Sequence, residues 1–117
     1  MSIELWSDDI VNVELQDDPA FTDDLTNLIE QTESNNHRHV VLNFSGVGYV
    51  NSSNIAKLLK LRKQLLMKKR RLVLCGIDTG VWGLFLVTGL DKVFEFADNV
   101  AMGLASIQIA DEPGPAA

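Results

Sequence analysis

Apolar and polar residues alternate in two short segments near the start of the chain, residues 3–6 and 10–15. A period of two is typical of β-strands that bury one face and expose the other. The polar tripeptide Ser7-Asp8-Asp9 separates the two segments and consists of residues that favour turns. The pattern therefore predicts an N-terminal β-hairpin in which each strand has one solvent-exposed face.

Two longer segments carry apolar residues at the three- and four-residue spacing of amphipathic helices. The first follows Asp17-Asp18-Pro19, where an aspartate can cap the helix and the proline suits its first turn. The second begins at residues 51–54, which are all good capping residues, and ends near Lys69. Its predicted apolar stripe consists of Ile55, Leu58, Leu59, Leu65 and Leu66.

Apolar runs between and after these helices predict three interior strands, and two shorter helices follow the last two strands. The strands cover residues 39–44, 71–77 and 92–96, and the helices cover residues 81–88, ended by Gly89, and residues 98–107. The order ββαβαβαβα indicates an α/β domain with a mixed, mostly parallel β-sheet and about four α-helices. We expect a single domain over residues 1–110 and a flexible tail over residues 111–117.

Charge is distributed unevenly along the chain. The net charge is −6, and residues 1–36 contain ten acidic residues and no basic one, whereas eight of the ten Lys and Arg residues lie between positions 57 and 71. A net negative charge argues against a general nucleic-acid-binding protein. Lys57 and Lys60 on the second helix could steer an acidic protein partner, contact phosphate groups or simply be solvated.

Several classes of protein are disfavoured by the sequence. The longest apolar runs, such as residues 84–87, are far shorter than the roughly 20 residues of a membrane span. The N-terminus lacks the basic and then apolar pattern of a signal peptide. We therefore expect a cytoplasmic protein without membrane insertion.

Candidate chemistry is sparse. The single cysteine, Cys75, lies in an apolar run and is expected to be a buried strand thiol. His37 and His39 are not accompanied by further ligands at metal-binding spacing, so no metal is predicted. The sequence has no glycine-rich phosphate loop or nucleophile elbow, and we predict neither catalysis nor a cofactor.

Residues 40–54 read VVLNFSGVGYVNSSN. This segment resembles the STAS domain family, in which an aliphatic strand runs through Asp-Leu-Ser-Gly-Val into an Asp-Ser-Ser/Thr-Gly turn. The resemblance continues in residues 72–77 (LVLCGI) and 88–94 (TGLDKVF). Three family positions differ, because the two aspartates and the turn glycine are replaced by Asn43, Asn51 and Asn54.

The resemblance extends to the bacterial anti-sigma-factor antagonists. In those proteins the second serine of the turn is phosphorylated by a partner that is both a serine kinase and an anti-sigma factor. The resemblance thus implies a protein-binding module with Ser53 as its phosphorylation site and Ser52 as second choice. The switch turn and partner surface would comprise Asn43, Asn51, Ser52, Ser53 and Asn54.

Physical chemistry supports an anionic group at this position independently of the resemblance, because the first turn of a helix favours negative charge. Simple helix capping by Ser52 and Ser53, without modification, is the alternative. Trp82 and Leu86 fall on a second face of the third predicted helix. They could form an exposed apolar anchor for a partner or be covered by a neighbouring element.

The sequence is compatible with three functions. The first is an anti-sigma-factor antagonist switched at Ser53. The second is a non-phosphorylated subunit or scaffold of a stress-signalling or lipid-transport complex, which the asparagine substitutions favour. The third is a small-ligand sensor, which would require a pocket. Homo-oligomers are compatible with each of them.

Overall fold

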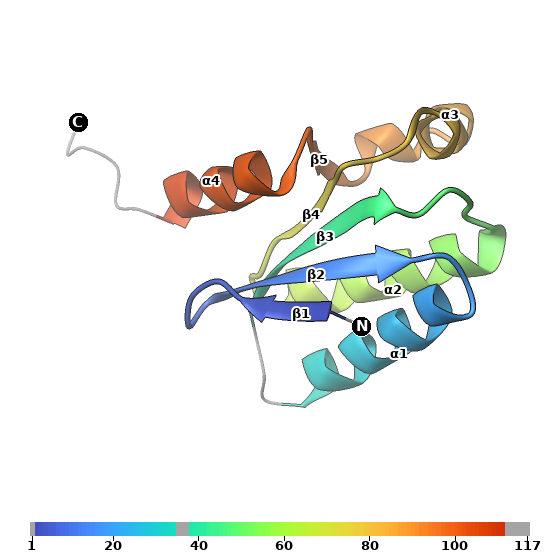
Figure 1. The fold of residues 1–117 in the computed structure, drawn as a ribbon. Coiled ribbons are helices and arrows are strands. Elements are labelled where there is room, and N and C mark those ends of the chain that lie inside the picture. Colours follow the sequence, from blue (N-terminus) through green and yellow to red (C-terminus); the bar gives the residue numbers. More distant parts are fainter. Residues whose placement is uncertain (1, 35–37, 112–117) are drawn as a thin grey trace.

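The computed structural model describes residues 2–34 and 38–111, which form a five-stranded sheet with helices on both faces (Figure 1). The strands are β1 (Ser2–Leu5), β2 (Ile10–Gln16), β3 (His39–Gly46), β4 (Leu72–Cys75) and β5 (Glu95–Ala97). The helices are α1 (Ala20–Glu33), α2 (Ser52–Met67), α3 (Thr79–Val87) and α4 (Val100–Asp111), with a 3-10 helix η1 (Leu90–Lys92). This order confirms the predicted fold class.

The strands lie side by side in chain order, β1-β2-β3-β4-β5. β1 pairs antiparallel with β2, and the three other pairings are parallel, which confirms the mixed sheet. Leu42 of β3 pairs with Val13 of β2 and with Leu74 of β4. Because the parallel strands share one direction, β3, β4 and β5 all end at one edge of the sheet, where loops lead into α2, α3 and α4.

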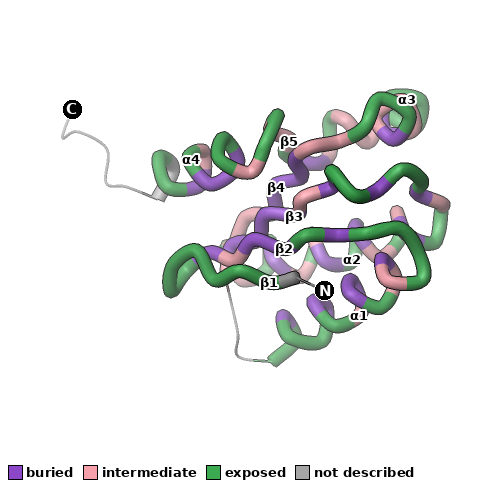
Figure 2. The backbone as a smooth tube through the Cα atoms, viewed as in Figure 1, coloured by how far each residue is buried: buried purple, intermediate pink, exposed green. Residues whose placement is uncertain are grey.

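Apolar side chains fill both sides of the sheet, and Figure 2 shows the buried positions along the central strands. The larger cluster joins the sheet to α1, α2 and α3 through residues such as Phe21, Leu58 and Phe85. The smaller cluster includes Cys75 and Ile107 of α4. Burial raises the pKa of the Cys75 thiol to about 11, and the prediction of a buried strand thiol is confirmed.

The prediction that each hairpin strand has one solvent-exposed face is wrong for part of β2, because α4 packs against it. Ile10 and Asn12 of β2 point away from the larger core, yet both are buried. Ile10 belongs to the same cluster as Leu104 and Ile107 of α4. The helix therefore covers part of the strand face that alternation alone assigns to solvent.

The C-terminal third differs most from the predicted boundaries. The strand predicted over residues 92–96 is only Glu95–Ala97, because residues 90–92 form η1. The helix predicted over residues 98–107 is shifted to Val100–Asp111. Gly89 adopts a left-handed φ of 74° after α3, which confirms its role as the terminating glycine.

No helix within residues 2–34 and 38–111 is long and apolar enough to cross a lipid bilayer. The predicted flexible tail over residues 111–117 lies outside the described residues from position 112 onward. His37 lies outside them as well.

Candidate partner surface at the start of helix α2

The turn between β3 and α2 is held by reciprocal hydrogen bonds between two asparagines. Asn51 is the N-cap, and its Oδ1 accepts from the backbone N–H of Asn54 at 2.8 Å. The Oδ1 of Asn54 accepts in return from the N–H of Asn51 at 3.0 Å. This capping box satisfies two backbone donors at the helix start. Of the four capping candidates at residues 51–54, Asn51 is the N-cap, whereas Ser52 and Ser53 are the first two residues inside the helix.

Asn54 also links the start of α2 to the start of α1. Its Nδ2 donates to Oδ2 of Asp18 at 3.1 Å and lies 3.3 Å from the hydroxyl of Thr22. The residue is only 1% exposed. Asn54 therefore corrects the predicted partner surface, since its side chain is an internal link between two helices and is not available to a partner.

Two neighbouring carboxylates tie the surrounding backbone together. Asp18 Oδ1 accepts from the N–H of Thr22 at 2.8 Å and from its hydroxyl at 2.6 Å. Hydrogen bonds from the Thr22 side chain, followed by those from Asn54, lower the pKa of Asp18. Asp17 Oδ1 accepts from the N–H groups of Gly48 and Tyr49 at 2.9 and 3.2 Å. The sequence interpretation assigned these aspartates only to the cap of the first helix.

Ser52 and Ser53 are exposed on top of this fixed turn. They are the first two residues of α2, and the hydrogen bonds beneath them are made by Asn51 and Asn54. A helix N-terminus carries a partial positive charge that favours an anion. A phosphate on Ser53 can therefore be accommodated without disturbing buried contacts.

Lys57 and Lys60 follow Ser53 by four and seven residues on α2, so the three share one face of the helix. Lys60 is exposed and Lys57 is half-buried. The structure therefore brings the predicted serine and the two predicted lysines together. This face extends from the N-terminus of α2 to its middle.

Asn43 has a local role at the end of β3. Its Oδ1 accepts from the N–H of Ser45 at 3.0 Å. A Cβ atom at Gly76 would lie only 2.9 Å from the same oxygen, so the glycine permits this close approach. Asn43 is half-buried and fixes the strand end beside the turn.

The two residues of the predicted apolar anchor, Trp82 and Leu86, both lie on α3 but differ in their exposure. Trp82 is half-buried and packs edge-to-face on Phe96 with ring centroids 4.8 Å apart. Trp82 and Phe96 also line a cavity of about 300 Å³ beside Asp98. Leu86 is 50% exposed, and its neighbour Val87 is 88% exposed. Trp82 is thus partly covered by Phe96 of β5, whereas Leu86 is accessible.

Tyr49 is an exposed aromatic residue that the sequence interpretation did not select. It is 68% exposed and lies in the loop immediately before the capping box. Tyrosine is enriched among residues that dominate binding energy at interfaces. Its position two residues before Asn51, beside the predicted turn, is the sequence feature from which its role could have been predicted.

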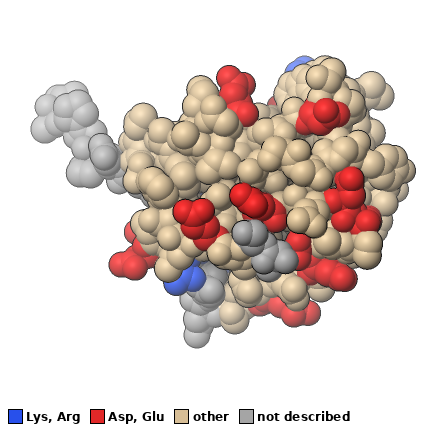
Figure 3. All heavy atoms as spheres, in the orientation of Figure 1, with Lys and Arg blue, Asp and Glu red and all other residues tan. Residues whose placement is uncertain are grey.

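The charges predicted to be segregated along the sequence are also unevenly distributed in space. Figure 3 shows one face on which acidic side chains are numerous and Lys and Arg are scarce. The basic residues belong mainly to α2 and to the segment that enters β4. The acidic face and the basic helix are thus distinct parts of the surface.

Several known structures share the fold of this chain. An anti-sigma-factor antagonist (STAS) domain protein from Planctomyces limnophilus superposes with a TM-score of 0.77 at 14% identity, covering 92% of this chain and 97% of that chain. The phosphorylated form of the Bacillus cell fate determinant SpoIIAA gives 0.71 at 16% identity, with coverages of 91% and 97%. A stressosome chain gives 0.70 at 22% identity, with coverages of 95% and 100%.

At these identities the structural matches show a common fold. The family relationship is established by the sequence itself, because the family model described as STAS domain matches residues 15–103. The matched segment includes β3, the turn with Ser53, and α2 to β5. The chain belongs to the STAS domain family.

Proposed function

We propose that this STAS domain is an anti-sigma-factor antagonist that binds a serine-kinase anti-sigma factor through the surface at the start of α2. In this proposal the kinase phosphorylates Ser53, and the phosphorylated form releases its partner. The observation that carries the proposal is the exposure of Ser53 on a turn whose neighbour, Asn54, is fixed from below. The domain then acts by binding and has no catalytic step of its own.

Electrostatics explains how such a switch would work without a change of fold. A phosphate adds about −1.5 to −2 charges at neutral pH. The helix N-terminus stabilises this charge, while Asp17 and Asp18 already make the adjacent loop acidic. A partner that docks closely on the unmodified turn would meet added bulk and charge, and repulsion of this kind costs several kcal/mol.

Intact-mass analysis after incubation with a candidate kinase and ATP tests the modification. The kinase should be a serine-kinase anti-sigma factor encoded beside this protein. We expect one added phosphate on the native chain, none on Ser53→Ala, and an unchanged reaction with Ser52→Ala. An active kinase that binds the native chain but modifies neither serine would contradict the switch.

Calorimetry on the unmodified and phosphorylated forms tests the consequence for binding. We expect phosphorylation to weaken the complex at least about tenfold, which corresponds to about 1.4 kcal/mol. Ser52→Ala is the matched control, because it removes an adjacent exposed hydroxyl on the same turn. Equal affinities of both forms would show that the phosphate does not control docking.

A second function, constitutive docking in a larger signalling assembly, is favoured by the neutral amides of Asn43, Asn51 and Asn54. They replace the family's aspartates and glycine, and no carboxylate takes part in the capping box. The fold is shared with a chain of the stressosome. Under this alternative, Ser53→Ala and Ser53→Glu would assemble with the partner as the native chain does, which light scattering of the mixed proteins can measure.

A further inference from the structure

The basic segment of the chain forms a second candidate site at the opposite end of α2 from Ser53. A cavity of about 330 Å³ is lined by three arginines, Arg62, Arg70 and Arg71. They come from α2, from the connection after it and from the approach to β4. Leu66, Leu72 and Val93 supply apolar walls, and Glu95 is the one acidic residue that lines it. We call this cavity the arginine pocket.

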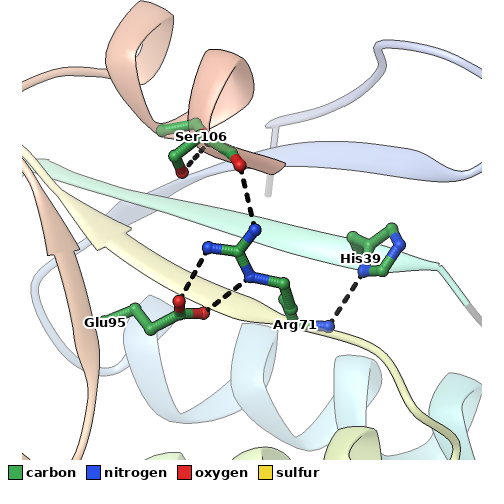
Figure 4. Close-up of polar contacts among 5 residues, drawn as sticks. His39, Arg71, Glu95 and Ser106 are labelled. Atoms are coloured by element: carbon green, nitrogen blue, oxygen red, sulfur yellow. Dashed lines mark hydrogen bonds and ion pairs between the residues drawn. The ribbon is translucent and has the colours of Figure 1, made fainter. Parts of the chain in front are cut away.

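One arginine of the pocket is held in place by protein groups. The guanidinium of Arg71 donates to both carboxylate oxygens of Glu95, at 3.0 and 2.7 Å, and to the carbonyl of Ser106 at 2.9 Å. Its backbone N–H donates to Nδ1 of His39 at 2.9 Å. Figure 4 shows this network, in which Arg71, the residue before β4, links β3, β5 and α4. Arg71 is therefore a rigid wall of the pocket.

The other two arginines retain unused hydrogen-bond donors. Arg62 donates from Nε to the carbonyl of Val93 at 3.0 Å, and within the described chain its terminal nitrogens make no hydrogen bond. Arg70 Nη1 lies 3.5 Å from Nε2 of His39. The Nε of Arg70 is buried and has no partner among the described residues. A buried charged donor without an acceptor carries a desolvation cost. Because the Nε of Arg70 is shielded from solvent, an anion in the pocket would meet the outer guanidinium nitrogens of Arg62 and Arg70.

The charge of the pocket indicates the kind of anion. Three positive side chains against the single carboxylate of Glu95 leave a formal charge of +2. Guanidinium groups remain protonated at all relevant pH values, and their fork matches phosphate oxygens. A phosphate monoester is close to a dianion above pH 7. The net charge therefore fits one phosphate group better than one carboxylate.

The size and the apolar walls favour a ligand larger than inorganic phosphate. About 330 Å³ falls at the small end of the volumes typical of organic ligand sites. Leu66 lines the pocket and is 52% exposed. An apolar group of a ligand can therefore pack against its exposed side chain. We propose that the arginine pocket binds a small organic phosphate monoester. This proposal does not depend on phosphorylation of Ser53.

Phenyl phosphate is a suitable probe, because it combines one phosphate with a compact apolar ring. We expect saturable amide chemical-shift changes in residues 66–72 and 93–95 of the full-length chain, and tighter binding than that of inorganic phosphate. Benzyl alcohol, which has the ring without the charge, should not compete. Absence of saturable shifts, or shifts centred on α4 instead, would overturn the assignment.

Matched variants distinguish specific binding in the arginine pocket from nonspecific attraction of an anion to a basic helix. Arg70→Gln should weaken phenyl phosphate binding about tenfold or more, because it removes a charged donor from the pocket. Lys63→Gln is the control, since Lys63 is an exposed cation on the same helix and does not line the pocket. It should change the affinity less than about twofold.

Arg62→Gln is a second pocket variant in case Arg70→Gln impairs folding, which circular dichroism will reveal. Its effect should resemble that of Arg70→Gln. If Lys63→Gln weakens binding as much as the pocket variants do, the phosphate is attracted by overall charge and the proposal fails. Ser53→Ala should leave binding unchanged, so failure here is distinguishable from failure of the phosphorylation switch.

Discussion

Asp18 shows how one side chain can connect stability to pH. Its carboxylate accepts hydrogen bonds from Thr22 and Asn54, and these contacts lower its pKa in the folded protein. The unfolded chain binds a proton at Asp18 more readily, so the stabilising effect is complete above the unfolded pKa. It is lost as the pH falls through the folded pKa.

We therefore expect Asp18→Asn to flatten the acid limb of the stability curve. Asparagine keeps an oxygen that can accept from Thr22 but cannot titrate. The free energy of unfolding of the native protein should fall more steeply between about pH 5 and pH 3 than that of the variant. Urea unfolding followed by fluorescence of the two tryptophans measures both slopes. Parallel slopes would mean that the hydrogen bonds at Asp18 do not favour its charged form.

Asn54 links the N-termini of helices α1 and α2 through its side-chain hydrogen bonds. Asn54→Ala removes half of the capping box and the contacts to Asp18 and Thr22. We expect a loss of about 1–3 kcal/mol in the free energy of unfolding, measured by chemical denaturation. Ser53→Ala, one residue away but exposed, should change it by less than about 0.5 kcal/mol. Equal effects of the two variants would contradict a structural role for Asn54.

The elements with strong periodicity could be predicted from sequence, and the tertiary contacts could not. The turn at Asn51 followed from capping propensity, but burial of Asn54 depends on Asp18, 36 positions earlier in the chain. The apolar stripe predicted for α2 is partly wrong. It includes Leu59 and Leu66, which are exposed, and omits Leu61, which is fully buried. Five leucines at closely spaced positions do not by themselves define which helical face meets the sheet.

The last strand was misplaced for a similar reason. Apolar residues run through Leu90, Val93, Phe94 and Phe96 without a clear period, so the pattern cannot separate η1 from β5. The aromatic contacts of Phe85 with Phe94 and Phe96 fix this segment against α3. The arginine pocket was equally hidden, because Val93 and Glu95 meet the three arginines only after β5 pairs with β4.

On the scale of the whole molecule, α2 connects the two proposed sites and also keeps them apart. Ser53 lies in its first turn, and Leu66 beside the arginine pocket lies in its last. Thirteen residues at 1.5 Å per residue place these positions about 20 Å apart along the helix. The Debye length at physiological ionic strength is about 8 Å. Direct electrostatic coupling across α2 is therefore almost completely screened.

We accordingly expect charge at Ser53 to leave the arginine pocket unaffected. Even unscreened in water, two unit charges 20 Å apart interact by only about 0.2 kcal/mol. Ser53→Glu should therefore change the Kd for phenyl phosphate by less than about 1.5-fold at physiological salt, measured by calorimetry beside Ser53→Ala. A change of tenfold or more would exceed what charge alone can produce over this distance. It would require that α2 or its contacts adopt two arrangements that both sites bias, because reciprocal coupling of about 1.4 kcal/mol needs such a two-state element.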